Sequence, residues 1–171
     1  MMETKAILDF ICRRRSVRRY QKKEIAPETL ELLMKAAMAA PSGNNVQPWE
    51  FVIVQDPQIK EALSRVHPWV YMAAEAPAAI VVLGDKSSEW WEDDCAAATE
   101  NFLLAAANLG LGTVWCGIKE GQAPAVRKIL GIPAKMGVLC IVPIGHPAES
   151  PPPHTKFRQD KVHRETYSGR W

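Results

Sequence analysis

The segment PSGNNVQPWEFVIV, residues 41–54, decides how this chain is divided between helix and sheet. It leads from Pro41 through a short polar turn into a run of aromatic and β-branched side chains. Proline cannot continue a helix, whereas the composition of residues 49–55 is typical of a strand. The segment therefore predicts a helix that ends at Pro41 and a sheet strand directly after the turn.

Two helices are expected before this turn. Apolar side chains at helical spacing predict the first over residues 4–12. The second is expected to begin at Pro27, because proline suits the first helical position and acidic residues follow in the first turn. The basic residues 13–23 would then connect the two helices.

Helices and strands continue to alternate downstream. Asp56 is suited to cap a helix that begins at Pro57. The buried face of that helix is expected to hold Ile59, Ala62, Leu63 and Val66. Further strands are predicted over residues 78–84, 113–118 and 138–145, and further helices over 92–109 and 125–130. The strand over 78–84 is apolar on both faces, which predicts a sheet covered by helices on both sides.

Length and composition fit an ordinary globular protein. The chain has 171 residues, of which 47% are hydrophobic, and a formal net charge of +2. We interpret residues 1–171 as one domain, located in the cytoplasm, since no apolar run approaches the roughly 20 residues of a membrane span and no secretory signal is apparent. The four cysteines lie far apart, a spacing that predicts mostly buried, reduced thiols rather than a metal site or disulfides.

Residues 151–171 are expected to form an extended arm. Prolines at 147, 151, 152 and 153 favour extended backbone without internal hydrogen bonds. The arm carries apolar side chains that are unfavourable in water, namely Phe157, Val162, Tyr167 and Trp171. A frayed terminus is one interpretation, and docking on a partner subunit is the one we favour.

Positive charge is concentrated in the basic segment, residues 13–23. It holds seven of the 21 Lys and Arg and no acidic residue, which leaves 14 basic against 19 acidic residues elsewhere. A nucleic-acid binder would spread its basic stripe over a face or a helix, so this class ranks last and no nucleic-acid partner is expected. A solvated run and an anion site remain as interpretations of the segment.

Two motifs, RRSVRRY at residues 14–20 and the segment at 41–54, together resemble the flavin-binding signatures of the nitroreductase family. The resemblance continues in the same order with GLGTVWCGI at 110–118, GIP at 131–133, IGHPAESPPP at 144–153 and a Lys-x-Arg at 156–158. It implies an α+β fold with three layers, α/β/α, around a central mainly antiparallel sheet. It also implies a homodimer that exchanges its carboxy-terminal arms and holds two FMN molecules at the interface.

The resemblance assigns one wall of the FMN site to the basic segment, with a contribution from the arm. The residues implied are Arg14, Arg15, Ser16 and Arg18, together with Lys156 and Arg158 at the phosphate. Arginine suits this task because it binds phosphate through paired, charge-assisted hydrogen bonds. Arg18 matches the position beside the ring edge that becomes negative on reduction, and a second phosphate ligand is the competing interpretation. Solvent-exposed positions are expected for Arg13, Arg19, Lys22 and Lys23.

The resemblance places two further segments at the flavin. Pro41, Ser42, Gly43 and Asn45 would contact the cofactor bound mainly by the other subunit, and Gln47 would reach its ring system. The same composition also fits an ordinary loop after a helix. Trp115, Cys116 and Gly117 are the candidates for the wall beside flavin N5, where relatives frequently carry two small residues and this chain has Gly117 followed by Ile118. Cys116 is interpreted as a packed thiol without a catalytic role.

The function that the resemblance implies is an FMN-dependent NAD(P)H oxidoreductase. It would transfer hydride in a ping-pong cycle through flavin N5 to a nitroaromatic, a quinone or a similar acceptor, with no catalytic side chain of its own. A flavin or quinone reductase on the same scaffold and a non-catalytic flavin-binding protein are the alternatives. The choice between NADH and NADPH stays open. The loop aromatics Trp69, Tyr71, Trp90 and Trp91 fit either core packing or a substrate lid.

Overall fold

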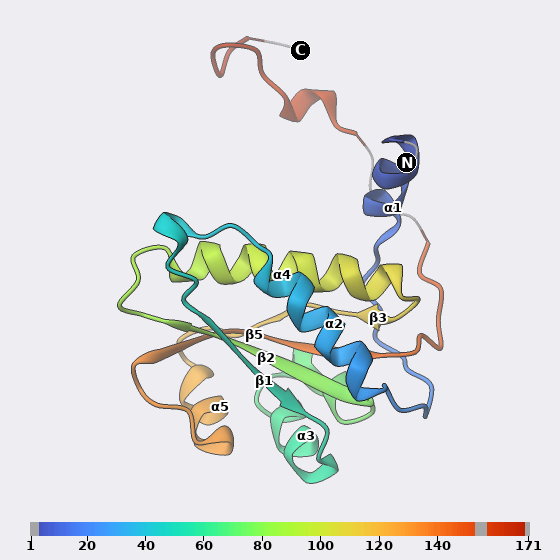
Figure 1. Ribbon diagram of the computed structural model, residues 1–171, viewed down its shortest axis with the longest axis vertical. Coiled ribbons are helices and arrows are strands. Elements are labelled where there is room, and N and C mark those ends of the chain that lie inside the picture. Colours follow the sequence, from blue (N-terminus) through green and yellow to red (C-terminus); the bar gives the residue numbers. More distant parts are fainter. Residues whose placement is uncertain (1–3, 153–156, 170–171) are drawn as a thin grey trace.

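The computed structural model describes residues 4–152 and 157–169, and its described strands form one sheet (Figure 1). The strands are β1 (Trp49–Val54), β2 (Ala78–Asp85), β3 (Gly112–Thr113), β4 (Cys116–Gly117) and β5 (Met136–Gly145). Their order is β1-β2-β5-β3, β4 also pairs with β5, and every strand pair is antiparallel. The predicted antiparallel sheet is therefore confirmed.

Helices cover both faces of this sheet (Figure 1). Helices α2 (Pro27–Met38) and α4 (Trp91–Asn108) lie on one face, and α3 (Pro57–Ser64) and α5 (Ala123–Leu130) lie on the other. Short 3-10 turns are η1 (Gly43–Asn45), η2 (Pro68–Ala73) and η3 (Gln159–Lys161). Helix α1 (Thr4–Arg13) and η3 stand apart from this body in Figure 1. The three-layer α+β architecture is confirmed.

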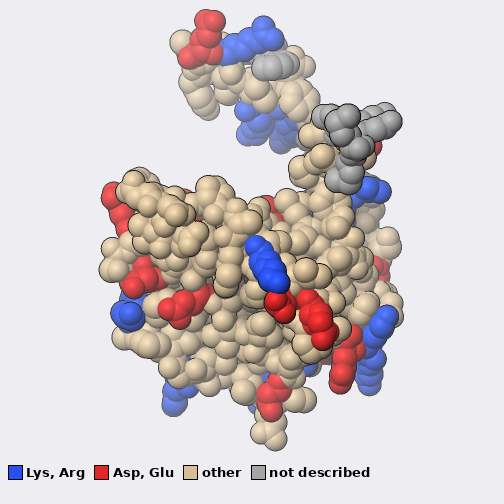
Figure 2. Space-filling model, in the orientation of Figure 1, with Lys and Arg blue, Asp and Glu red and all other residues tan. Residues whose placement is uncertain are grey.

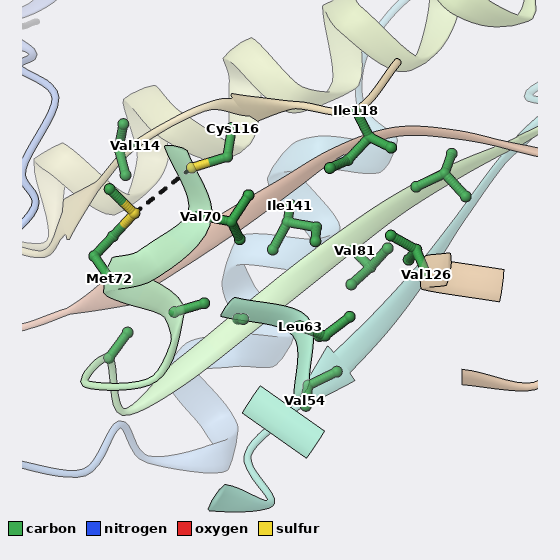
Figure 3. Close-up of a cluster of buried hydrophobic side chains, with 14 of the residues drawn as sticks. Val54, Leu63, Val70, Met72, Val81, Val114, Cys116, Ile118, Val126 and Ile141 are labelled. Carbon is green, nitrogen blue, oxygen red and sulfur yellow. Dashed lines mark hydrogen bonds between the residues drawn. The ribbon is translucent and has the colours of Figure 1, made fainter. Parts of the chain in front are cut away.

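Strand β2 separates two hydrophobic cores. Alternate residues such as Val81 pack in the core that contains Leu63 of α3 and Val126 of α5, which Figure 3 shows. Its other residues, such as Ile80, pack in the core that contains Phe102 of α4. Successive side chains of a strand point to opposite faces, so a strand that is apolar throughout needs cover on both sides. The expectation for residues 78–84 is confirmed.

Local capping sets the start of α3, but its buried face differs from the prediction. Asp56 accepts hydrogen bonds from the backbone N–H groups of Gln58 and Ile59, both at 2.9 Å. Ile59 is nevertheless exposed, so its predicted burial is wrong, while Leu63 is fully buried. Lys60 is buried instead, because its aliphatic stem packs and its Nζ donates to backbone carbonyls, the nearer being that of Ala76 at 2.6 Å.

The single strand predicted over residues 113–118 is wrong in part. It is divided into β3 and β4, which keep one register on β5, with Thr113 opposite Ile144 and Cys116 opposite Ile141. Val114 and Trp115, which lie between the two strands, are not paired with β5. A sequence rich in β-branched and aromatic side chains predicts strand throughout, and the local departure depends on how the segment packs.

The amino end of α4 rests on the sheet through Trp91. A Cβ atom at Gly84 would lie 2.5 Å from the ring of Trp91, and one at Gly137 would overlap the same ring. Two facing glycines thus make room for an indole lying directly on the backbone. The predicted carboxyl end of this helix is also confirmed, since Gly110 follows Leu109 with a left-handed φ of 72°. Within residues 4–152 and 157–169, no helix is long and apolar enough to cross a membrane.

Candidate active site

The basic segment lies between the sheet and the start of the arm. The Val17 N–H donates to the Thr113 carbonyl at 2.9 Å, which places the segment beside β3. The Gln21 N–H donates to the His146 carbonyl at 2.9 Å, so the same segment also follows the chain that leaves β5. Residues far apart in the sequence are therefore joined by backbone hydrogen bonds at one end of the sheet.

The arginines of this segment have different environments. Arg14 is partly buried, with its Nε 3.6 Å from a carboxylate oxygen of Glu100 in α4. The Arg15 guanidinium donates to backbone carbonyls, those of Cys12 and Arg14 at 2.7 Å and that of Pro152 at 3.2 Å. Arg15 thus ties the end of α1 to the start of the arm, whereas Arg14 is drawn toward α4.

Ser16 and Arg18 border a pocket of about 370 Å³, which we call the Ser16 pocket. Tyr71 and Glu149 lie on its other sides. The Arg18 N–H donates to Glu149 Oε1 at 2.6 Å, while the exposed Arg18 guanidinium has no hydrogen bond or ion pair within the described residues. The backbone at this position is therefore fixed and its cation is free to meet a ligand.

Trp115 and Gly117 border a second pocket of about 450 Å³, the Trp115 pocket, which Trp91 also lines. Gly117 is exposed and carries no side chain, which leaves the strand backbone open at this point. The Ile118 N–H is already bound to the Leu139 carbonyl at 3.0 Å. A backbone donor toward a ligand must therefore come from Gly117 or the residues before it.

Cys116 points away from solvent into the core of Figure 3. It is 3% exposed, and its thiol donates toward the sulfur of Met72 at 3.8 Å. Burial raises the pKa of the Cys116 thiol to about 11, although nearby Arg18 lowers it somewhat. The thiolate is the reactive form, so an un-ionised thiol fits the predicted packing role rather than nucleophilic chemistry.

The polar loop, residues 41–47, is ordered by its own hydrogen bonds. Ser42 Oγ accepts from the Gln47 N–H at 3.0 Å. Asn44, Asn45 and Gln47 adopt left-handed backbone, with φ of 49°, 55° and 52°. Their side chains are exposed, and the loop borders a third pocket of about 480 Å³, the Trp90 pocket. Polar side chains are thus presented outward by a backbone that is unusual for residues other than glycine.

The predicted site residues are divided among these pockets within one chain. The polar loop contributes to the Trp90 pocket, whereas Ser16 and Gly117 line the other two. Lys156 lies outside the described residues. Arg158 pairs with Asp160 within the arm, at 3.1 Å and 2.5 Å, and the arm stands away from the body (Figure 1). The structure does not bring Arg158 to the basic segment, and its role stays a prediction.

Sequence reasoning did not single out three polar or aromatic groups at these places. The sequence pattern marks Tyr71 only as a loop aromatic and gives Glu149 no role, whereas both line the Ser16 pocket. Asp94 has no assigned site role either, yet its Oδ1 accepts a hydrogen bond from the Gly43 N–H at 2.9 Å. No local signal connects these residues, because 51 positions separate Asp94 from Gly43.

The comparison with family models decides what kind of protein this is. The model described as the nitroreductase family matches residues 11–67 and 62–146. The chain belongs to the nitroreductase family. The matched residues include the basic segment, the polar loop and β4.

One relative and two solved structures match this chain over nearly their full lengths. A protein of Archaeoglobus fulgidus, provisionally named NADH dehydrogenase/NAD(P)H nitroreductase, is 41% identical over 170 residues, 94% of this chain and 98% of its own. A crystal structure with the same provisional name from Bacteroides thetaiotaomicron has a TM-score of 0.92 and 40% identity, covering 95% and 98% of the two chains. An FMN-dependent nitroreductase from Clostridium difficile has a TM-score of 0.89 and 30% identity, covering 94% and 99%.

The residues present fit FMN. Guanidinium groups and a hydroxyl in the segment 14–18 match a phosphate, and Gly117 leaves strand backbone accessible to a flat ring. Ser16 forms a parallel bridge with Thr113 of β3, which lies three positions before Cys116, the first residue of β4. The basic segment, which carries the candidate phosphate ligands, and the exposed backbone of Gly117 thus lie along the same edge of β5.

Proposed function

We propose that this nitroreductase-family protein is an FMN-dependent NAD(P)H oxidoreductase that works by a ping-pong cycle. The observation that carries the proposal is the bridge between Ser16 and Thr113, which joins the basic segment to β3, on the same edge of β5 as β4 with its exposed Gly117. When bound, FMN supplies the hydride chemistry, from the nicotinamide to flavin N5 and on to an oxidised acceptor. The protein supplies binding, orientation and charge.

The phosphate is bound, in this proposal, by Arg14 and Ser16. Arg14 is partly buried and, among residues 4–152 and 157–169, has only a long contact with Glu100, so a dianionic phosphate would be a stronger partner. Lys156 and Arg158 would join it once the arm has docked. Arg15 contributes by holding α1 and the arm together rather than by direct contact, since backbone carbonyls already accept from its guanidinium.

Arg18 is proposed to stabilise the negative charge that reduction leaves on the ring edge. Its backbone is fixed through Glu149, and its guanidinium has no partner within residues 4–152 and 157–169. A fixed cation beside a developing anion stabilises the charged form without reorganisation. A second contact with the phosphate remains the competing role for Arg18, and the two roles predict different effects of substitution.

We further propose that two copies assemble, and that each polar loop contacts the flavin of the other. The loop lies at a different pocket from Ser16 and Gly117, which supports a contribution across an interface. Figure 2 shows largely uncharged surface over α4, where few Lys, Arg, Asp or Glu side chains are visible. Exposed apolar side chains lie on α2, Leu32 and Met38, and on the arm, Phe157 and Tyr167. Such patches on one protein are typical of an interface.

The acceptor is proposed to be a small planar oxidised compound, such as a nitroaromatic or a quinone. Trp90 is half-exposed at one pocket and Trp91 lines another, so aromatic rings are available for stacking. A flavin reductase is the second candidate, because a Bacillus subtilis relative named FMN reductase [NAD(P)H] is 30% identical over 176 residues. Assays of nitroaromatics, quinones and free FMN side by side separate these candidates.

The decisive experiment is the absorbance of the purified, FMN-reconstituted protein during anaerobic addition of NADH or NADPH. We expect a bound flavin spectrum that bleaches with one or both nicotinamides and returns when an acceptor is added. A yellow protein that does not bleach would support the non-catalytic flavin-binding alternative. A protein that binds no FMN at all would overturn the proposal.

A further inference from the structure

A buried carboxylate holds the polar loop to the first turn of α4. Asp94 is 6% exposed, and its Oδ1 accepts a hydrogen bond from the backbone N–H of Gly43 at 2.9 Å. A hydrogen bond to an ionised acceptor is roughly twice as strong as one between neutral groups. Asp94 therefore fixes the position at which the loop leaves the helix before it.

Trp90, the residue just before α4, supports the loop by packing. A Cβ atom at Gly43 would lie 3.0 Å from Cδ1 of Trp90, so the ring covers the backbone at this position closely. Trp90 is itself tied to Asp94, whose backbone N–H donates to the Trp90 carbonyl at 2.9 Å. One helical turn thus contacts Gly43 with a hydrogen bond and with an aromatic ring.

The loop needs such external support because its own backbone is unfavourable. Asn44, Asn45 and Gln47 have positive φ values, and residues with a Cβ atom seldom adopt this region. The single side-chain hydrogen bond within the loop joins Ser42 to Gln47. The exposed amides are therefore presented in a defined direction only while the loop stays attached to α4.

The second oxygen of Asp94 shows that the carboxylate is not explained by core packing. Oδ2 is buried, and within the described residues it has no hydrogen-bond partner. A buried carboxylate with one unpaired oxygen is unfavourable for an isolated fold. An apolar side chain would fill the same space at a lower cost, so the contribution of Asp94 is its hold on Gly43.

We propose that Asp94 is a positioning residue for cofactor binding, which fixes the polar loop in the shape that contacts the flavin of a second subunit. The inference rests on the proposed function, since the contact between loop and flavin belongs to that proposal. Asp94 itself acts through the Gly43 backbone and does not touch the cofactor. Loss of its acceptor oxygen should loosen the loop and weaken FMN binding together.

The test compares three variants of the full chain with the wild type. Asp94→Ala removes the acceptor, and Asp94→Asn keeps a carbonyl oxygen that can accept from Gly43. Thr99→Val is the matched control, because the fully buried Thr99 hydroxyl donates within the same helix to the Cys95 carbonyl at 2.7 Å, away from the loop. The measurements are hydrogen exchange of peptides covering residues 41–48 without FMN, the FMN dissociation constant from flavin fluorescence, and the melting temperature.

For Asp94→Ala we expect loop exchange at least about tenfold faster and FMN binding at least about fivefold weaker. Asp94→Asn should recover most of both losses, whereas Thr99→Val should lower the melting temperature and leave loop exchange and FMN affinity unchanged. Unchanged loop exchange in Asp94→Ala, or faster exchange with unaltered FMN affinity, would overturn this inference alone. A wild-type protein that does not bind FMN would overturn the proposed function, and this role with it.

Discussion

Gly84 in β2 is the register partner of Gly137 in β5, and the two face the same side of the sheet under one indole ring. The ring is that of Trp91, the first residue of α4 and a wall of the Trp115 pocket. The pair therefore determines how close the amino end of α4 comes to the sheet. Trp90 and Asp94, which contact Gly43 of the polar loop, lie at the same end of α4. The glycine pair therefore also sets the distance of these two residues from the sheet.

The first prediction concerns this close approach. Gly137→Ala would force its new methyl group into the Trp91 ring, and we expect a loss of about 1–3 kcal/mol in the free energy of unfolding. Gly121→Ala is the control, because a Cβ atom there would meet nothing within 4 Å. Urea unfolding of both variants measures the difference. Equal stabilities would contradict the packing that the structure shows.

The second prediction concerns charge beside the flavin ring. Arg18→Gln keeps a donor and removes the cation, so the two-electron reduction potential of bound FMN should fall by about 20–65 mV. Lys22→Gln, which removes an exposed charge of the same segment, should leave it unchanged. Spectroelectrochemical titration at saturating FMN measures the potential. Weaker FMN binding with an unchanged potential would favour the phosphate role for Arg18 instead.

The third prediction concerns recognition of the phosphate. FMN should bind at least about tenfold more tightly than riboflavin, because each charge-assisted hydrogen bond contributes about 1.5–3 kcal/mol. Arg14→Gln should reduce that preference by weakening FMN binding while riboflavin binding stays the same. Fluorescence titration of both flavins tests this. Equal affinities for FMN and riboflavin in the wild type would exclude a phosphate site.

The fourth prediction follows from the buried thiols. Burial raises the pKa of Cys116 to about 11 and that of Cys95 to about 12, above the usual value of 9.0. The folded state then retains these protons at a pH where the unfolded state loses them. Stability is therefore fully present below about pH 9 and should decrease toward pH 11, by about 1.4 kcal/mol per pH unit for each thiol.

Urea unfolding between pH 8 and pH 10.5 measures this slope. Cys12→Ser is the control, because Cys12 is exposed and its removal should leave the slope unchanged. At pH 8, iodoacetamide should modify Cys12 in the folded protein and reach the three buried cysteines only after unfolding. A flat stability profile, or rapid labelling of Cys116 in the folded state, would show that burial is weaker than the structure indicates.

The fifth prediction concerns the arm. Deleting residues 151–171 should convert a dimer to monomer and release FMN, since Phe157 and Tyr167 are 74% and 88% exposed in the single chain and gain apolar burial on docking. Sedimentation and absorbance after gel filtration measure both effects. The double variant Phe157→Ser/Tyr167→Ser, which keeps the chain length, should show the same direction. A truncated protein that stays dimeric and yellow would exclude arm exchange.

Local sequence signals predicted most of the fold. Pro27, Asp56 with Pro57, and Gly110 mark helix boundaries that the structure reproduces, because capping and proline geometry act within a few residues. The apolar run of β2 predicted helices on both faces of the sheet, because successive side chains of a strand point to opposite faces. Ile59 and Lys60 are neighbours in α3, and only the packing of this short helix decides which of the two side chains is buried.

The candidate site was predictable as motifs but not as geometry. The order of the residues already showed that arginines, a serine and a polar turn follow one another as is typical of the family. Only the tertiary structure showed that Arg15 binds backbone carbonyls, that Ile118 has no free N–H, and that a buried carboxylate holds the turn. Periodicity and capping are short-range effects, whereas the contact between Asp94 and Gly43 exists only after α4 has packed on the sheet with Trp91 over its two glycines.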